Sequence, residues 1–358
     1  MSASQDSKRI EFLDVARGMG IVCVILGHNL WSRSRGSAII FNFHMPLFYF
    51  LSGIFFSPEK AKTRKAIIKK VFSILAPVPF FAAIACLVFL AEPCLLHLVT
   101  RRTLYTFLIH GEPWYDKPLW FFVSLAGVVL VFSLVSRLLY GRHQKGRRIV
   151  FLAICAVMSF AVAMMPLSFR KLWSPAMVTT LPLGLFYYGL GCFSKTWIER
   201  LGFDCKSSSF LLMAIVAIFA VVLLLSVDVA TKPDIRTARI GSWLLFPRSL
   251  CGIAAVVSLA RAIPESLGRP LAYVGRNSVV FFSLEFVTFP YIAKALGGVV
   301  PGYNHFKIAE LTPYWQSLAA VLSQMIVLAA LSPIITRMLS KWKIWLAHYC
   351  ISGERRVS

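Results

Sequence analysis

Residues 9–28 read RIEFLDVARGMGIVCVILGH, a run that is long and apolar enough to cross a bilayer but contains Asp14, Arg17 and His28. A charged side chain at the centre of a membrane costs about 2.5–3.5 kcal/mol on insertion scales, so such groups usually face a bundle interior and serve a function there. In a helix, the eleven residues from Arg17 to His28 make about three turns, which places both side chains on one face roughly 16 Å apart. Asp14 lies one turn before Arg17 on nearly the same face. The sequence therefore predicts a first membrane helix with one polar wall.

The composition of the chain indicates an all-α, polytopic integral membrane protein. Of the 358 residues, 58% are hydrophobic and only 15% are charged, whereas soluble domains carry about 25% charged residues. The net charge of +23 comes mainly from basic residues in short loops. Anionic lipid headgroups and anionic cytosolic ligands account for this charge, so we expect no nucleic acid as a partner. The eight cysteines show no metal-ligand spacing, which predicts neither a metal site nor a disulfide framework.

About ten apolar segments reach or approach the length of a transmembrane helix. They cover residues 11–31, 39–57, 71–91, 118–140, 149–166, 176–194, 209–227, 242–262, 275–297 and 314–338. The loops after the even-numbered segments, together with the two chain ends, contain 24 Lys and Arg, and the other loops contain 12. By the positive-inside rule, this bias places both termini in the cytoplasm. We expect one membrane-embedded domain over residues 1–345 and a short basic cytoplasmic tail over residues 346–358, in a multi-pass plasma-membrane protein.

The polar wall of the first segment offers groups for acid–base chemistry. The imidazole of His28 suits proton abstraction from a hydroxyl, because its unperturbed pKa is about 6.5. The guanidinium of Arg17 offers a fixed fork for a phosphate, a carboxylate or a carbonyl oxygen. A structural interpretation stays open, in which Asp14 and Arg17 neutralise each other and His28 bonds to a neighbouring helix.

Further polar groups lie at segment ends or inside segments. His44 precedes Pro46, near the expected outer surface, and is either a site residue or a capping and interfacial group. Trp120 is either an interface anchor or a platform for a sugar. Arg248 and Glu285 are the remaining charges inside spans, and each is a candidate for a functional pathway. Glu285 could orient an imidazolium or pair with an arginine.

The stretch Arg276-Asn277-Ser278 has the character of a helix start. Asn277 or Ser278 can cap the helix, and the free amide N–H groups of its first turn suit an anion. A plain N-cap with no ligand is the alternative.

Several of these motifs occur together, and in a fixed order. The first 55 residues contain Leu13-Asp14-x-x-Arg17-Gly18, then Gly27-His28, then Met45-Pro46-Leu47-Phe48-x-Phe-x-Ser52-Gly53. Later come Ile68-Lys69-Lys70, Pro118-Leu119-Trp120-Phe121-Phe122 and Gly275-Arg276-Asn277-Ser278. This series resembles the membrane-bound acyltransferase 3 family over about residues 9–340. Members of that family O-acylate, and usually O-acetylate, glycans.

The resemblance implies a division of labour among the candidate residues. Arg17 and His28 match the Arg and His of the family's first helix, which implies a role for both in acyl transfer, with Asp14 beside them. We assign the acyl-CoA donor to Lys69, Lys70, Arg276, Asn277 and Ser278, and acceptor or supporting roles to His44, Trp120, Glu285 and Arg248. The Phe-His-Met-Pro sequence around His44 is similar to the fucose 4-O-acetylase-like branch.

Two positions depart from the family's pattern. Lys69-Lys70 stand where the family often has an Arg-x-x-Arg pair, and a lysine is a point charge without the bidentate fork of arginine. Glu285 stands where a histidine commonly ends the polar motif of the corresponding span.

These features predict a membrane O-acetyltransferase of the bacterial inner membrane. It would move an acetyl or other short acyl group from cytosolic acyl-CoA to a sugar hydroxyl of a cell-surface or lipid-linked glycan, a form of polysaccharide modification. His28 would be the general base or would carry the acyl group transiently. The expected partners are acyl-CoA as co-substrate, a glycan or glycolipid acceptor and membrane lipids, with no bound cofactor. A secondary transporter or a glycolipid flippase is the alternative, because ten spans with buried charges suit that class equally.

Overall fold

A computed structural model gives the fold of the chain. It describes residues 3–29, 35–59, 61, 63–91, 119–140, 145–166, 168–169, 178–201, 208–227, 243–299 and 314–352, which form helices and no strand. The helices are α1 (Ala3–Asn29), α2 (Arg35–Ile54), α3 (Arg64–Leu75), α4 (Pro77–Ala91), α7 (Trp120–Leu139), α8 (Lys145–Met164), the 3₁₀ turn η3 (Val178–Thr180), α10 (Leu181–Leu201), α11 (Ser208–Ser226), α12 (Leu245–Ala262), α13 (Glu265–Arg276), α14 (Ser278–Val299) and α15 (Tyr314–Ser352).

The chain is an all-α, multi-pass membrane protein. Within the described residues, seven helical segments are long and apolar enough to cross a membrane: Phe12–Asn29, Arg35–Ile54, Arg64–Val88, Trp120–Leu139, Lys145–Met164, Leu245–Ala262 and Gln316–Leu346. Helices α10, α11 and α14 occupy the other three segments that the sequence predicts. The total of ten spans and the cytoplasmic position of both termini stay predictions.

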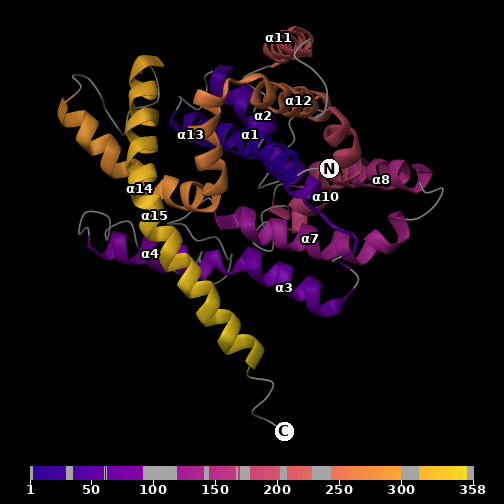
Figure 1. The fold of residues 1–358 in the computed structure, drawn as a ribbon, viewed down its shortest axis with the longest axis horizontal. Coiled ribbons are helices and arrows are strands. Elements are labelled where there is room, and N and C mark those ends of the chain that lie inside the picture. The colour runs from indigo at the N-terminus through magenta and orange to yellow at the C-terminus, as the bar shows by residue number, and fades with distance from the viewer. Residues whose placement is uncertain are drawn as a thin grey trace.

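Helix α1 lies near the centre of the bundle, where it packs against α2, α12, α13, α14 and α15 (Figure 1). Its closest partner is α13, and glycines make the approach possible. A Cβ on Gly18 would collide with the Leu271 carbonyl, and a Cβ on Gly275 would collide with the Asp14 carbonyl. Small residues of this kind let helix backbones approach closely in membranes. The helix with the polar wall is therefore fixed from several sides.

Helix α13 lies in a region where the sequence predicts a cytoplasmic loop. It has twelve residues, contains Pro270 and carries charges such as the exposed Glu265–Arg269 ion pair at 2.7 Å. A short, partly charged helix gives no membrane-span signal. Its packing on α1 is a tertiary feature that local sequence reasoning does not capture.

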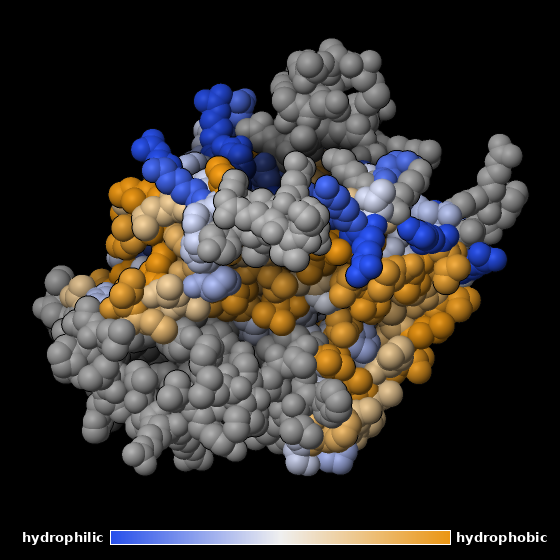
Figure 2. Space-filling view, turned by 90° about the horizontal axis from the view of Figure 1, so that it is seen from below, coloured by the Kyte–Doolittle hydropathy of each residue, from blue (hydrophilic) through white to orange (hydrophobic). Residues whose placement is uncertain are grey.

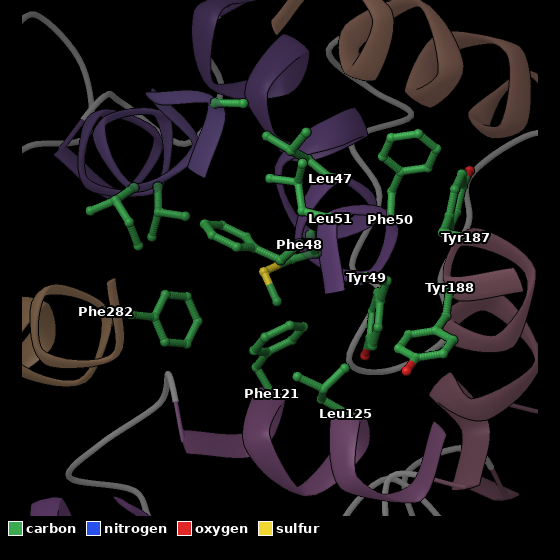
Figure 3. Close-up of a cluster of buried hydrophobic side chains, with 14 of the residues drawn as sticks. Leu47, Phe48, Tyr49, Phe50, Leu51, Phe121, Leu125, Tyr187, Tyr188 and Phe282 are labelled. Atoms are coloured by element: carbon green, nitrogen blue, oxygen red, sulfur yellow. The ribbon is translucent and has the colours of Figure 1, made fainter. Parts of the chain in front are cut away.

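A second close contact joins α2 to α10. Here Gly53 approaches the Tyr188 carbonyl and Gly191 approaches the Phe50 carbonyl, again too closely for a Cβ. Beside this contact lies the aromatic core shown in Figure 3, in which Phe121 of α7 packs its ring on Phe282 of α14, with ring centroids 5.7 Å apart. This core joins α2, α7, α10 and α14 into one packed unit.

Helices α3 and α4 form one apolar segment that is interrupted at Ala76. The cause is Pro77, which has no N–H to donate to the preceding turn. The indole N–H of Trp342, on α15, donates to the Ala76 carbonyl at 3.0 Å. The break is thereby tied to α15, which continues to Ser352 and has 39 residues, about 58 Å in length. That is longer than a bilayer core of ~30 Å, and Figure 1 shows its C-terminal end extending beyond the other helices.

The surface has an apolar band. Figure 2 shows hydrophobic side chains forming a continuous area with hydrophilic side chains above it. Large apolar side chains are exposed on α8, α11 and α15, and they include Ile149, Val157, Leu211, Leu225, Ile326 and Ile334. This distribution is the one expected of helices that face lipid.

Candidate active site

The polar wall of α1 begins with an ion pair near the middle of the helix, close to the start of its membrane-crossing part, Phe12–Asn29. The guanidinium of Arg17 donates to Asp14 Oδ1 at 3.1 Å, and the side chains are 25% and 9% exposed respectively. The Arg17 guanidinium also lies over the Phe55 ring, 4.9 Å from its centroid. Because the opposite charges are paired locally, this part of the wall is close to neutral. The structural interpretation of the sequence anticipates this pairing of Asp14 with Arg17, and the structure contains it.

The other end of the wall carries a histidine–carboxylate pair. His28 Nδ1 lies 2.8 Å from Glu285 Oε1, which joins α1 to α14 across 257 residues of sequence. The Glu285 side chain is 1% exposed, whereas that of His28 is 39% exposed. In the His28 tautomer that carries its proton on Nδ1, Nδ1–H donates to the carboxylate oxygen and the lone pair of the imidazole is on Nε2. From the sequence, Glu285 could either orient an imidazolium or pair with an arginine. In the structure its partner is the imidazole of His28, and the hydrogen bond orients that ring.

The second oxygen of Glu285 has no hydrogen-bond partner within the described part of the chain, although it is fully buried. An unsatisfied buried acceptor is costly, and a catalytic role is one of the explanations for such a group. The carboxylate therefore retains an acceptor next to the histidine.

Residues on both sides of this pair are bonded to one another. Gln324, on α15, donates to the Glu285 carbonyl at 2.6 Å and to Thr288 Oγ1 at 3.1 Å. Its Oε1 accepts from the side-chain amide of Asn29, the residue after His28, at 3.1 Å. The carbonyl of Asn29 accepts from Ser317, also on α15, at 3.2 Å. Three helices thus meet through buried polar groups next to the pair.

His44 lies close to this region through an aromatic side chain. The Phe41 ring packs edge-on against both imidazoles, with centroid distances of 5.8 Å to His28 and 4.9 Å to His44. His44 Nδ1 donates to the Ile40 carbonyl at 2.8 Å and the residue is 4% exposed. Both histidines are therefore on one side of the bundle, His44 buried and His28 open.

The candidate donor residues lie on α3 and around the junction of α13 and α14. Lys69 and Lys70 are exposed on α3, and Arg276 is exposed at the end of α13. Asn277 is the single residue between α13 and α14; its side chain donates to the Tyr273 carbonyl at 2.9 Å and accepts from Thr336 of α15 at 3.1 Å. Helix α14 begins at Ser278, where the sequence predicts a helix start. Asn277 thus ties three helices together at this junction.

Trp120 and Arg248 occupy different places. Trp120 is half-buried at the first position of α7, with its ring against Phe121. Arg248 is buried on α12, and its Nε lies 3.4 Å from Ser226 Oγ at the end of α11. Neither residue has a described bond to the His28–Glu285 pair.

A comparison with protein-family models now adds to this geometry. Residues 10–332 match a family model described as an acyltransferase domain of the acyltransferase 3 type. The match covers most of the chain. The chain belongs to the acyltransferase 3 family. No curated protein and no solved structure matches it.

This membrane acyltransferase therefore has a chemically coherent site at the end of α1. An imidazole whose Nδ1–H is held by a buried carboxylate can take up a proton at Nε2, and the positive charge that results is stabilised by Glu285. Within the described residues, no group of His, Cys, Asp and Glu side chains could hold a metal ion.

Sequence reasoning finds part of this site and misses the rest. The spacing of Arg17 and His28, and the charge of Glu285 inside an apolar run, single out three of its members. Asn29, Thr288 and Gln324 are uncharged and received no role. The one available signal was an amide at Gln324 within the apolar run of residues 314–338, since polar side chains inside membrane segments commonly bond between helices.

Proposed function

We propose that this acyltransferase moves an acetyl or other short acyl group from cytosolic acyl-CoA to a sugar hydroxyl of a cell-surface or lipid-linked glycan. The observation that carries the proposal is the pair of His28 Nδ1 and Glu285 Oε1 at 2.8 Å, with Glu285 buried and His28 open. A hydroxyl is a poor nucleophile until a base removes its proton. The pair supplies a base whose tautomer and orientation are fixed.

The reaction proceeds in one displacement. The acceptor hydroxyl approaches the open side of His28, and Nε2 takes its proton while the oxygen attacks the thioester carbonyl carbon. A C–O bond forms, the C–S bond breaks, and CoA leaves as a thiolate that receives the proton from the imidazolium. In a second form of the mechanism, His28 Nε2 attacks the thioester first, so that an N–C bond forms and the C–S bond breaks. The acceptor hydroxyl then takes the acyl group from Nε2, and its proton goes to the CoA thiolate.

The donor reaches this base along α1. Arg17 lies about three helical turns from His28 on the same wall, and its side chain is 25% exposed, so it keeps N–H groups for a phosphate or carbonyl oxygen. Lys69, Lys70 and Arg276 attract the anionic CoA toward the same side of the membrane. Support for the cytoplasmic position of this side comes from the distribution of Lys and Arg among the loops.

The acceptor lies on the opposite side, toward the open edge of His28. The support for a glycan acceptor is family membership together with the aromatic groups beside the base, Phe41 and the buried His44 next to it. Fucose is the candidate sugar that the Phe-His-Met-Pro sequence suggests. With this acceptor, the enzyme would act in the inner membrane of a bacterium.

Two experiments test the proposal. The first compares surface glycans of a deletion strain with those of the parent, and we expect an acyl ester to be lost on deletion and restored by the wild-type gene. The second measures whether purified protein slowly hydrolyses acetyl-CoA. A secondary transporter or glycolipid flippase has no reason to cleave the thioester, so identical glycans together with the absence of any cleavage would contradict the proposal.

A further inference from the structure

The side-chain amide of Gln324 makes three hydrogen bonds inside the bundle. One goes to the backbone carbonyl of Glu285, and the other two go to Asn29, which follows His28, and to Thr288, which lies one turn after Glu285. Gln324 is 0% exposed, and between Leu318 and Leu331 the other residues of its helix are apolar apart from Ser323. Burying an amide is unfavourable by a few kcal/mol unless its groups are hydrogen-bonded. An apolar residue would fill the same space without that penalty, so the bonds themselves account for an amide here.

The direction of each bond is determined by the partners. The Glu285 carbonyl can only accept, so the atom 2.6 Å from it must be the Gln324 NH₂ group. The same reasoning applies to Asn29, whose NH₂ group lies 2.8 Å from the Ile25 carbonyl and therefore also faces Gln324 Oε1. Gln324 consequently bridges two different helices, with its oxygen toward α1 and its nitrogen toward α14.

The two ends of the bridge adjoin the two members of the pair. Asn29 directly follows His28 in α1, and the Glu285 carbonyl belongs to the same residue as the carboxylate. The second Gln324 N–H goes to Thr288 Oγ1, one turn further along α14. The bridge therefore constrains the separation of the two backbone positions that set the distance from His28 Nδ1 to Glu285 Oε1.

We propose that Gln324 is a positioning residue that holds the end of α1 against α14, so that the imidazole of His28 and the carboxylate of Glu285 stay in hydrogen-bond register. This inference deepens the proposed function and rests on it for what the pair does. It makes no use of Gln324 as an acid, a base or a substrate ligand. Gln324 acts only through the geometry of the pair.

The structure indicates that an apolar replacement leaves few unsatisfied groups. In Gln324→Met, the Asn29 amide keeps the Ile25 carbonyl, and the Thr288 hydroxyl keeps the Leu284 carbonyl at 2.9 Å. The Glu285 carbonyl still lies 3.2 Å from the Thr288 hydroxyl of the same helix. We therefore expect Gln324→Met to fold, because removal of a polar group is tolerated when its partners have other bonds.

The direct test is the proton resonance of the His28 Nδ1–H group in purified protein labelled with ¹⁵N-histidine, assigned by its loss in His28→Ala. We expect the exchange of this proton with solvent to be at least tenfold faster in Gln324→Met than in wild type. Ser332→Ala is the matched control, since it removes a buried bond of the same helix, 2.6 Å to the Tyr273 hydroxyl, away from the pair. An unchanged exchange rate in Gln324→Met, or an equal increase in Ser332→Ala, would overturn the inference.

A second variant and a kinetic measurement complete the test. Asn29→Ala removes the bridge from the α1 side, and we expect the same acceleration of exchange. In acyl-transfer assays, we expect Gln324→Met to lower kcat with little change in KM, and to have almost no further effect on kcat in a Glu285→Gln background. Additive losses would contradict a role through the pair. Because the resonance is measured without substrate, failure of acyl transfer in wild type would count against the proposed function alone.

Discussion

The pair of His28 and Glu285 combines an exposed imidazole with a buried carboxylate. The Glu285 side chain is 1% exposed, whereas that of His28 is 39% exposed. In the proposed mechanism this asymmetry gives each group a separate role. The exposed His28 meets the substrate, and Glu285 stabilises the imidazolium and orients the ring.

Replacement of Glu285 by Gln separates charge from shape. The amide oxygen still accepts from His28 Nδ1–H, but the negative charge that stabilises the imidazolium is absent. We expect kcat to fall by roughly 10- to 100-fold, which is less than the ~10²–10⁴-fold contribution of a general base itself. Steady-state acyl-transfer kinetics measure the effect. Ser283→Ala is the control, because it removes a buried hydroxyl of the same helix that has no described partner, and a kcat for Glu285→Gln within twofold of this control would count against the assignment.

Individual site residues were predictable only where their chemistry is unusual for a membrane segment. Arg17 and His28 could be placed on one face by helical periodicity, and Glu285 was conspicuous as a buried charge. Its partnership with His28 spans 257 positions and depends on how α1 and α14 pack. The bond between Asn29 and Gln324 spans 295 positions and involves neutral amides. No local pattern contains such information.

At the level of elements, α1 depends on α13, the helix that the sequence did not predict. The backbones of the two helices meet at Gly18 and Gly275, where no side chain fits. The Asp14–Arg17 ion pair lies at this contact. We therefore regard α13 as the element that fixes the part of the polar wall around Asp14 and Arg17.

Gly275→Ala tests this contact. The added Cβ would meet the Asp14 carbonyl, so the two helices must separate, and we expect a loss of about 1–3 kcal/mol of stability, as for other overpacked sites. Thermal unfolding in detergent gives the readout. In Gly146→Ala, the matched control on α8, the new Cβ meets nothing within 4 Å, so stability should stay the same or rise slightly. Equal unfolding midpoints for the two variants would mean that the contact is loose.

Helix α3 is the element assigned to the anionic donor. Exposed lysines act through solvent, and their attraction for CoA is screened by salt. Replacing Lys69 and Lys70 together by Gln should raise the KM for acyl-CoA and make it less dependent on ionic strength, with kcat nearly unchanged. Donor titrations at low and high salt measure this, and Arg147→Gln on the exposed start of α8 is the control. An unaltered salt dependence in the double variant would remove α3 from the donor path.

For the whole molecule, hydrophobicity was sufficient to predict the class of fold and the position of most helices. All ten predicted segments contain helix in the described residues, because an apolar run must satisfy its backbone internally in lipid. Hydrophobicity does not specify which helices are neighbours. The Gly-mediated contacts and the meeting of α1, α14 and α15 are properties of the assembled bundle.

The distribution of Lys and Arg predicts the orientation of the molecule, and this prediction can be tested independently of activity. A fusion at the C-terminus to a fluorescent protein that folds only in the cytoplasm should be bright, and a fusion to a phosphatase active only outside should be inactive. The same reporters inserted between residues 92 and 117 should give the opposite result. A phosphatase-active C-terminal fusion would reverse the proposed sides of donor and acceptor.

The role of His28 in acyl transfer is tested by incubating membranes with labelled acetyl-CoA and measuring label in glycan. Membranes with wild-type protein, and with the control Ser159→Ala on lipid-facing α8, should transfer the label. Membranes with an equal amount of His28→Ala should transfer it about 10²–10⁴-fold more slowly. Transfer by His28→Ala at the wild-type rate would contradict the assignment of the chemistry to this histidine.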